Sequence, residues 1–149
     1  MRTRYARMLS AGLAVIAAAS FSACKEIEEE SSAGYEPSKL SAIKGKSEDF
    51  QRVTFTKEGA ARTGLETGRV TRTGGRKTIP YESLIYNDEA KTFVYTSSKP
   101  LNYERVPITV DRIEDDRVYL AQGPAVGTTV VTVGASEVYG AELDIAGSH

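Results

Sequence analysis

Few side chains in this 149-residue chain could support acid–base or nucleophilic chemistry. The only histidine, His149, is the last residue, where a frayed terminus rarely holds catalytic geometry. No Ser-His-Asp or Cys-His set can be assembled without another histidine or a free cysteine. The Gly74-Gly75 pair lacks the Lys-Ser/Thr that follows in a phosphate-binding P-loop.

Carboxylates are the remaining candidates for catalysis. Five of them could pair for general acid–base work: Glu82, Glu104, Glu114, Asp115 and Asp116. The last three fall in a predicted hairpin turn, where acidic residues are ordinary turn formers. We therefore predict no catalytic, cofactor-binding or metal-ligating residue, and we expect the protein not to be an enzyme.

Cys24, the only cysteine, has the clearest chemical role. Before it come three arginines (Arg2, Arg4 and Arg7), an apolar stretch over residues 8–19, and Phe21-Ser22-Ala23. This is the pattern of a signal peptide, cleaved near small residues. The junction also resembles the lipobox of bacterial lipoproteins, although Phe21 stands where leucine is more usual. That resemblance implies removal of residues 1–23, diacylglycerylation of the Cys24 thiol and acylation of the new N-terminus.

Other roles for Cys24 fit the sequence less well. A lone cysteine forms no internal disulfide, and no neighbouring ligand supports a metal site. The residues after it, 25–30, are mostly charged and would not enter a core. The apolar stretch is shorter than the roughly 20 residues that cross a bilayer as a helix. A lipid anchor on the extracytoplasmic face of the cell membrane is the expectation, with a plain secreted protein as the alternative.

Size and charge limit the function further. Removal of residues 1–23 leaves 126 residues, enough for one domain. Because the removed part carries three arginines and no acidic residue, the formal net charge moves from −1 to −4. A mildly acidic chain with mixed signs has no electrostatic footprint for nucleic acid.

The chain after Cys24 begins with a polar segment. Residues 24–51 are rich in charge, serine, glycine and proline and show no hydrophobic period. Such a segment buries too little apolar surface to offset its ordering entropy. We predict a disordered tether over residues 24–51, a folded domain over 52–145 and a short tail over 146–149.

Alternating apolar residues and turn signals indicate strands through the domain. Short strands are predicted near residues 53–55, 65–72, 78–86, 92–96, 105–110, 117–121 and 128–133. Thr56 and Gly64 are the cap residues expected around one short helix. The predicted fold is mainly β, a small antiparallel barrel or sandwich with at most one or two short helical turns. Val106, Ile108, Val110, Val118, Leu120, Val131 and Val133 are expected to face one core.

The order of these segments is similar to the membrane-proximal part of the membrane fusion proteins, the periplasmic adaptors of efflux pumps. The matching segments are Ile79–Tyr86, Phe93-Val94-Tyr95, Arg105–Val110 and Gly123–Ala135, and further upstream Val53–Thr56 with Gly64–Val70. Pro124 and Thr128 depart from the leucine and aspartate of the family pattern. A full adaptor also carries a lipoyl-like domain and a long helical hairpin, where this chain has only residues 71–77.

The resemblance implies a non-catalytic, adaptor-like or accessory subunit of a membrane transporter or efflux system. Its partners would be the membrane, through the lipid anchor, and a transporter permease or a separate adaptor polypeptide. The inference is an analogy at the level of fold. The alternative is an independent lipoprotein module that binds a small molecule or an envelope polymer. Scattered tyrosines suit either a protein interface or a ligand groove.

Overall fold

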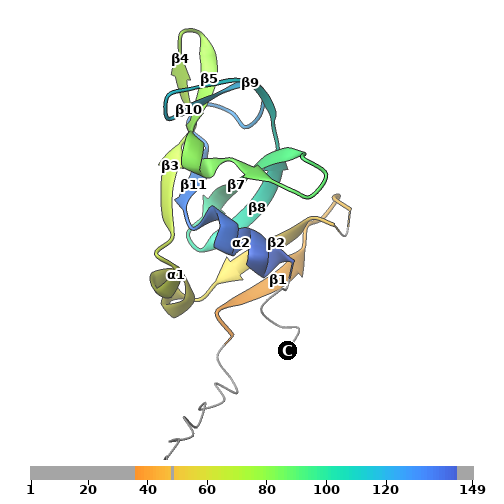
Figure 1. Ribbon diagram of the computed structural model, residues 1–149. Helices are drawn as coiled ribbons and strands as arrows, with labels where there is room; N and C mark the ends of the chain where they lie inside the picture. Colours follow the sequence, from red (N-terminus) through yellow and green to blue (C-terminus); the bar gives the residue numbers. More distant parts are fainter. Residues whose placement is uncertain (1–35, 48, 144–149) are drawn as a thin grey trace, which may run out of the picture. The chain divides into compact units, whose positions relative to one another are not determined.

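The computed structural model describes residues 36–47 and 49–143. The chain separates into two units, Met1–Ala33 and Gly34–His149, and every described residue belongs to the second. Its elements are, in order, β1 (Ser38–Ala42), β2 (Gln51–Phe55), α1 (Lys57–Thr63), β3 (Glu66–Arg69), β4 (Thr71–Thr73), β5 (Arg76–Pro80), the 3-10 turn η1 (Tyr81–Ser83), β6 (Ile85–Tyr86), β7 (Thr92–Lys99), β8 (Asn102–Pro107), β9 (Thr109–Glu114), β10 (Arg117–Gln122), β11 (Thr129–Val133) and α2 (Ala135–Glu142) (Figure 1).

Two antiparallel sheets make up the domain. Sheet A has the strand order β1-β2-β8-β7-β11-β3, with β6 paired to β7, and sheet B has the order β4-β5-β10-β9. Both sheets are open, and every strand pair is antiparallel. The predicted mainly β, antiparallel fold is thus confirmed, in a sandwich-like form.

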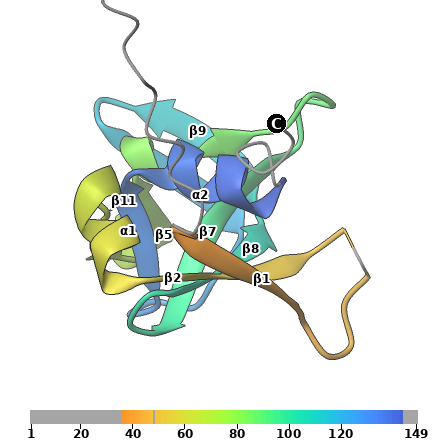
Figure 2. The same ribbon diagram turned by 90° about the horizontal axis from the view of Figure 1, so that it is seen from below.

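Hydrophobic residues gather in two cores on opposite faces of sheet A. The helix-side core consists of Val53, Phe55, Phe93, Tyr95, Tyr103, Val131, Ala135 and Val138. The sheet-side core consists of Val70, Ile79, Leu84, Val94, Ile108, Val118, Leu120 and Val130. The two helices lie on one side of sheet A, α1 against β2 and α2 against β2 and β7 (Figure 2).

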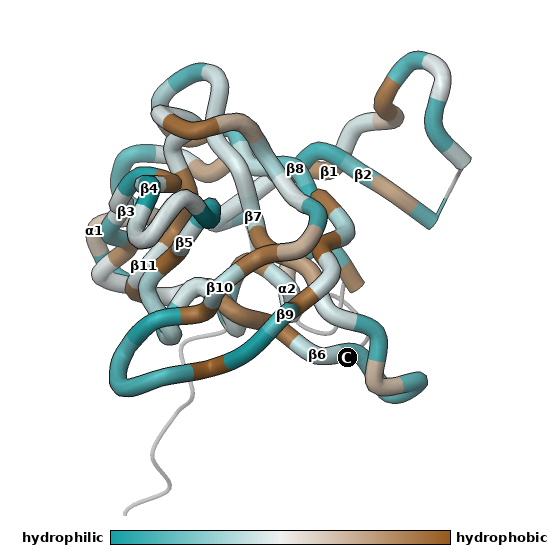
Figure 3. Tube along the Cα trace, turned by 90° about the horizontal axis from the view of Figure 1, so that it is seen from above, coloured by the Kyte–Doolittle hydropathy of each residue, from teal (hydrophilic) through white to brown (hydrophobic). Residues whose placement is uncertain are grey.

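Within sheet A, β7 and β11 are buried on both faces. Successive strand residues point to opposite faces, so Val94 enters the sheet-side core while Tyr95 enters the helix-side core. Val130 and Val131 divide in the same way, and both are fully buried. The hydropathy of the chain changes along the strands accordingly, with brown and teal segments interleaved (Figure 3).

Two short breaks carry the chain from sheet A to sheet B. Val70 separates β3 from β4, and Ile108 separates β8 from β9. Each break residue is buried in the sheet-side core, so the corners of the sandwich are packed rather than exposed. The single strands expected over 65–72 and 105–110 are therefore each two strands, one in each sheet. Pro107, which has no N–H to donate, ends β8 at the second corner.

The predicted single core is wrong in two respects. Val131 faces the helix-side core, whereas Ile108, Val118 and Leu120 face the other one. Val133 is 45% exposed, because the register shifts after Val131 and Gly134 turns the chain into α2 at φ 81°. Val106 and Val110 do pack against the sheet-side core, partly buried.

The domain starts earlier than predicted. Ser38–Ala42, inside the stretch expected to be a tether, forms β1 and pairs with β2 over its whole length. Leu40 packs against the helix-side core, and the Pro37 carbonyl accepts a hydrogen bond from the Thr56 N–H at 3.0 Å. Strand pairing supplies the stabilisation that the polar composition does not, so the folded region begins before Arg52.

The residues at the two ends of α1 explain where this helix begins and ends. In α1 the Thr56 side chain accepts a hydrogen bond from the Gly59 N–H at 2.9 Å, and Gly64 ends the helix at φ 63°. These are the caps that the sequence predicts. The second helix, α2, was not expected inside a β domain. Its buried positions, Ala135, Val138 and Glu142, follow a helical spacing.

Candidate functional site

The predicted lipidation site lies outside the described residues. The same is true of the predicted signal peptide over 1–23, the tail over 146–149 and the terminal His149. Lipidation of Cys24 therefore stays a prediction. In the described part of the chain no helix is both long and apolar enough to cross a membrane.

Glu104, one of the five candidate carboxylates, is held in a surface ion pair. Its Oε1 lies 2.6 Å from Arg52 Nη2 and 2.8 Å from Arg52 Nε. The two residues face each other across β2 and β8. Glu104 therefore joins two strands of sheet A and is separated from the other four.

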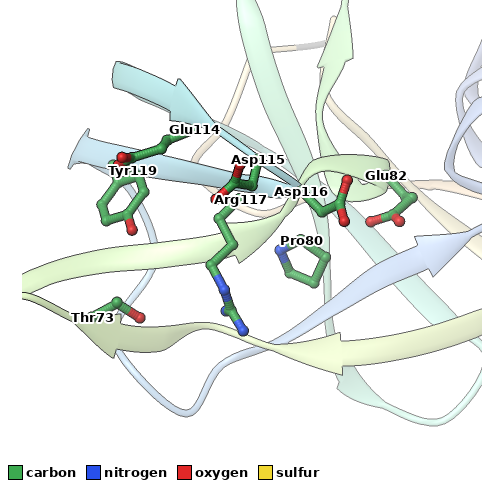
Figure 4. A pocket seen from close by; sticks show the side chains of 8 residues that line it. All are labelled: Thr73, Pro80, Glu82, Glu114, Asp115, Asp116, Arg117 and Tyr119. Carbon is green, nitrogen blue, oxygen red and sulfur yellow. The ribbon is translucent and has the colours of Figure 1, made fainter.

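The other four carboxylates line one pocket of about 440 Å³. This acidic pocket is formed by Thr73, Pro80, Glu82, Glu114, Asp115, Asp116, Arg117 and Tyr119 (Figure 4). Glu114 is the last residue of β9, Asp115 and Asp116 form the turn to β10, where Asp115 has φ 51°, and Glu82 comes from η1. The Tyr81 N–H donates to the Asp116 carbonyl at 3.0 Å. That backbone bond brings η1 beside the hairpin turn.

The acidic pocket opens on the face of sheet B that points away from the core. Val118 is buried inward, so Arg117 and Tyr119 on either side of it point outward. The Arg117 side chain extends across Pro80 toward Thr73 (Figure 4). The Arg112 guanidinium lies 3.7 Å from the centre of the Tyr119 ring. This stacking covers Tyr119, a residue that is 8% exposed.

The charges of the acidic pocket are only partly paired. Arg112 Nε donates to Glu114 at 3.2 Å, and this hydrogen bond raises the pKa of Arg112 further. No hydrogen bond or ion pair joins the side chains of Glu82, Asp115, Asp116 or Arg117 to another described residue. Among the described residues no group of three His, Cys, Asp or Glu side chains is placed to hold a metal ion. The pocket thus presents solvated charges of both signs, which suits contact with a polar surface.

A buried charge cluster under α2 was missed by the sequence analysis. Glu142 is 4% exposed. Its Oε2 accepts a hydrogen bond from Tyr95 Oη at 2.5 Å and lies 3.2 Å from Arg105 Nε, while Oε1 accepts from the Gln51 N–H at 3.1 Å. A helical period over residues 135–142 could have indicated this burial. Glu142 lies on the same helix face as Ala135 and Val138, and that face is otherwise apolar.

Arg105 completes this cluster among aromatic rings. Its guanidinium lies 4.7 Å from the centre of the Phe50 ring and 5.0 Å from that of Phe93. Arg105 Nη2 also donates to the Asp49 carbonyl. Burial, and next the Glu142 carboxylate, raise the pKa of Tyr95 far above its ordinary value. These contacts hold α2 and the start of β2 against the middle of sheet A. The cluster therefore stabilises the fold.

Comparison with known proteins finds no matching family model, no matching curated protein and no matching solved structure.

Proposed function

We propose that this chain is a non-catalytic, lipid-anchored extracytoplasmic protein that serves as an adaptor-like or accessory subunit of a membrane transporter or efflux system. The proposal rests on the resemblance to membrane fusion proteins and on the places that the matching segments occupy in the fold. It concerns one domain of such an adaptor, carried on its own anchor.

The observation that carries the proposal is where the family-like segments lie. Phe93-Val94-Tyr95 is in β7 and Val130-Val131-Thr132 is in β11. These strands are neighbours, and both are buried between the two cores. Few side chains fit in strands that are covered on both faces. Matches at these positions therefore support a fold shared with the resembled family.

The glycines of the closing segment support the same reading. Gly127 has φ 89° and Gly134 has φ 81°, values that residues with a Cβ adopt at a cost. At Gly134 an added Cβ would also lie 2.4 Å from the Leu65 side chain. The spacing of these glycines therefore reflects backbone geometry around β11 rather than chance composition.

Residues 71–77 mark the departure from a full adaptor. They form the tight hairpin of β4 and β5, with Gly74 at φ 56° and Gly75 at φ 80°. A full adaptor of the resembled family would leave the domain here to build its lipoyl-like part and helical hairpin. The proposed role is therefore docking close to the membrane, without the long outward reach of a complete adaptor.

A lipid anchor at Cys24 would make weak docking sufficient. Tethering to the membrane raises the effective concentration of the domain for a membrane-embedded partner. An interface at the small end of the usual range is then enough. The unpaired charges of the acidic pocket are exposed for such a contact.

Crosslinking in native membranes tests the proposal. A photoreactive residue placed at Asp115, in the mouth of the acidic pocket, is expected to capture a transporter permease or a separate adaptor polypeptide. The same probe at Lys39, on the edge strand β1, is the matched control. The proposal fails if the Asp115 probe captures no transporter component from membranes that contain the lipidated chain, or captures it no better than the Lys39 probe.

An independent binding module for a small molecule or an envelope polymer is the second candidate. One observation favours it: in a second pocket, on sheet A, the hydroxyl groups of Thr67, Ser98 and Thr129 have no hydrogen-bond partner in the described chain. A ligand-induced rise in melting temperature, without capture of a transporter component, would select this function.

A further inference from the structure

A second pocket, of about 350 Å³, lies on sheet A at the end of the β7–β8 hairpin. Thr129 on β11 pairs with Ser97 on β7, and Val131 pairs with Thr67 on β3. Paired and alternate residues share a face, so these three hydroxyl side chains point to the same side as Val131. We call this the hydroxyl pocket. It adjoins the helix-side core.

Most hydrogen-bond donors of the hydroxyl pocket are unused. Ser97 Oγ donates to the Lys99 carbonyl at 2.7 Å, which steadies the hairpin. The hydroxyls of Thr67, Ser98 and Thr129, which also line the pocket, make no hydrogen bond with another described residue. Unused hydroxyl donors from β3 and β11, those of Thr67 and Thr129, therefore face the same space.

Tyr103 adds a solvent-accessible hydrogen-bond donor to this pocket. The residue is 5% exposed, and its ring packs edge-on against Phe55 with the ring centres 6.0 Å apart. Its hydroxyl has no partner among the described residues, yet it is not sealed from solvent. Its phenol is protonated at neutral pH and can donate a hydrogen bond, and burial raises its pKa further.

The charge of the hydroxyl pocket has one sign. Lys99 is the only charged residue that lines it, and no carboxylate does. The Lys99 ammonium forms no ion pair with a described residue. A single lysine in a pocket that is also lined by hydroxyl donors favours an anion with oxygen acceptors.

Apolar side chains complete the wall beside these donors. Leu65, Pro100 and Leu101 also line the pocket. Leu101 has φ 65° in the β7–β8 turn, a conformation that costs energy for a leucine. It packs against the helix-side core together with Leu65. The pocket therefore has one polar wall and one apolar wall.

We propose that the hydroxyl pocket binds a small monocarboxylate with a short apolar chain. The carboxylate accepts from the Lys99 ammonium and from the hydroxyls of Tyr103 and Thr129, and the apolar chain lies on Leu65 and Leu101. One ammonium balances one negative charge, which favours a carboxylate over a phosphate monoester carrying about −1.5 to −2 at neutral pH. This site is independent of the proposed transporter contact.

Hexanoate is the probe that tests the proposal. The ¹⁵N-labelled lipidated chain is titrated with hexanoate, and its amide resonances are followed. Saturable shifts are expected at Thr67, Ser98, Lys99 and Thr129. Acetate, which lacks the chain, and 1-hexanol, which lacks the charge, are expected to bind more weakly than hexanoate.

Variants distinguish hexanoate binding at this pocket from nonspecific uptake of hexanoate by detergent. Lys99→Met is expected to weaken hexanoate binding on the order of tenfold, because a hydrogen bond to a charged group is lost. Thr129→Val is expected to weaken it by about threefold. Lys39→Met, which removes a lysine on the far edge strand β1, is the matched control and should change nothing. Equal binding of hexanoate and 1-hexanol, shifts outside this pocket, or equal affinity in Lys99→Met and Lys39→Met would overturn the proposal.

Discussion

Tyr95 Oη lies 2.5 Å from Glu142 Oε2, so the middle of β7 is bonded directly to the last residue of α2. The same carboxylate oxygen is 3.2 Å from Arg105 Nε on β8. One buried carboxylate thereby ties two central strands to the helix that covers them. Removing it leaves the Arg105 guanidinium, with its side chain 11% exposed, without its counter-charge.

Glu142→Ala is expected to lower the free energy of unfolding by about 3–5 kcal/mol, because an uncompensated buried charge remains. Urea denaturation measures the change. Glu137→Ala, on the exposed face of the same helix, is the control and should stay within about 0.5 kcal/mol of the parent. Equal losses in the two variants would show that Glu142 has no special role.

Tyr95 predicts a loss of stability at alkaline pH. Burial and Glu142 raise its pKa in the folded protein above the ordinary value of 10.0, with Arg105 acting in the opposite direction and Tyr139 in the same one. The folded form thus keeps the phenol proton that the unfolded form loses. The contribution is fully present below pH 10 and declines as the pH rises above it.

Tyr95→Phe isolates this effect. Below pH 10 the variant should be less stable than the parent by about 1.5–3 kcal/mol, since a buried hydrogen bond to a charged group is lost. Above pH 10 the difference should shrink. Tyr86→Phe, at a tyrosine that is 49% exposed, is the control. A difference that stays constant up to pH 12 would contradict the assignment.

Ile108 and Ile113 form a second matched pair. Ile108 is 7% exposed at the corner between the sheets, whereas Ile113 on β9 is 45% exposed. Ile108→Ala is expected to cost about 2–5 kcal/mol, because a cavity is left in the sheet-side core. Ile113→Ala should cost well under half of that in the same denaturation experiment. The two-core description would be refuted by a neutral Ile108→Ala.

Two helical glycines are expected to respond in opposite directions. At Gly59 in α1 an added Cβ would lie 2.3 Å from the Pro37 carbonyl oxygen, but at Gly140 in α2 it would meet nothing within 4 Å. Gly140→Ala should therefore raise the unfolding free energy by about 0.5–1 kcal/mol through helix propensity. Gly59→Ala should lower it, since the backbone of the segment before β1 must move. Thermal unfolding distinguishes them, and stabilisation by both would show that Pro37 does not pack there.

Lipidation of Cys24 has its own test. Mass spectrometry of the mature N-terminus is expected to show an acylated cysteine as the first residue. Cys24→Ser should move the protein from the membrane fraction to the soluble fraction, because more than one acyl chain gives stable anchoring. Ser31→Ala, a few residues further on, is the control. An unmodified Cys24 in membranes would disprove the hypothesis.

The strands were largely predictable because their signals are local. Alternation places Val118 and Leu120 inward, and paired glycines make the β4–β5 turn, as the sequence indicates. The caps of α1 at Thr56 and Gly64 also follow from residue type alone.

The remaining features depend on contacts between distant parts of the chain. β1 is polar, and only its pairing with β2 makes it a strand. The two cores could not be separated by period-2 alternation, which assigns faces within a strand but not between strands. The burial of Glu142 depends on Tyr95, 47 residues earlier in the chain, and on Arg105. Glu114, Asp115 and Asp116 are neighbours in the sequence, so their proximity was predictable. Nothing in the sequence indicated that Glu82 lines the same pocket.

The order of strands in sheet A has a consequence for how the chain folds. β3 pairs only with β11, and Gln51 at the start of β2 is bonded to Glu142, 91 residues further on. Sheet A therefore cannot be completed until nearly the whole domain is available. Such non-local pairing gives folding times on the order of milliseconds to seconds.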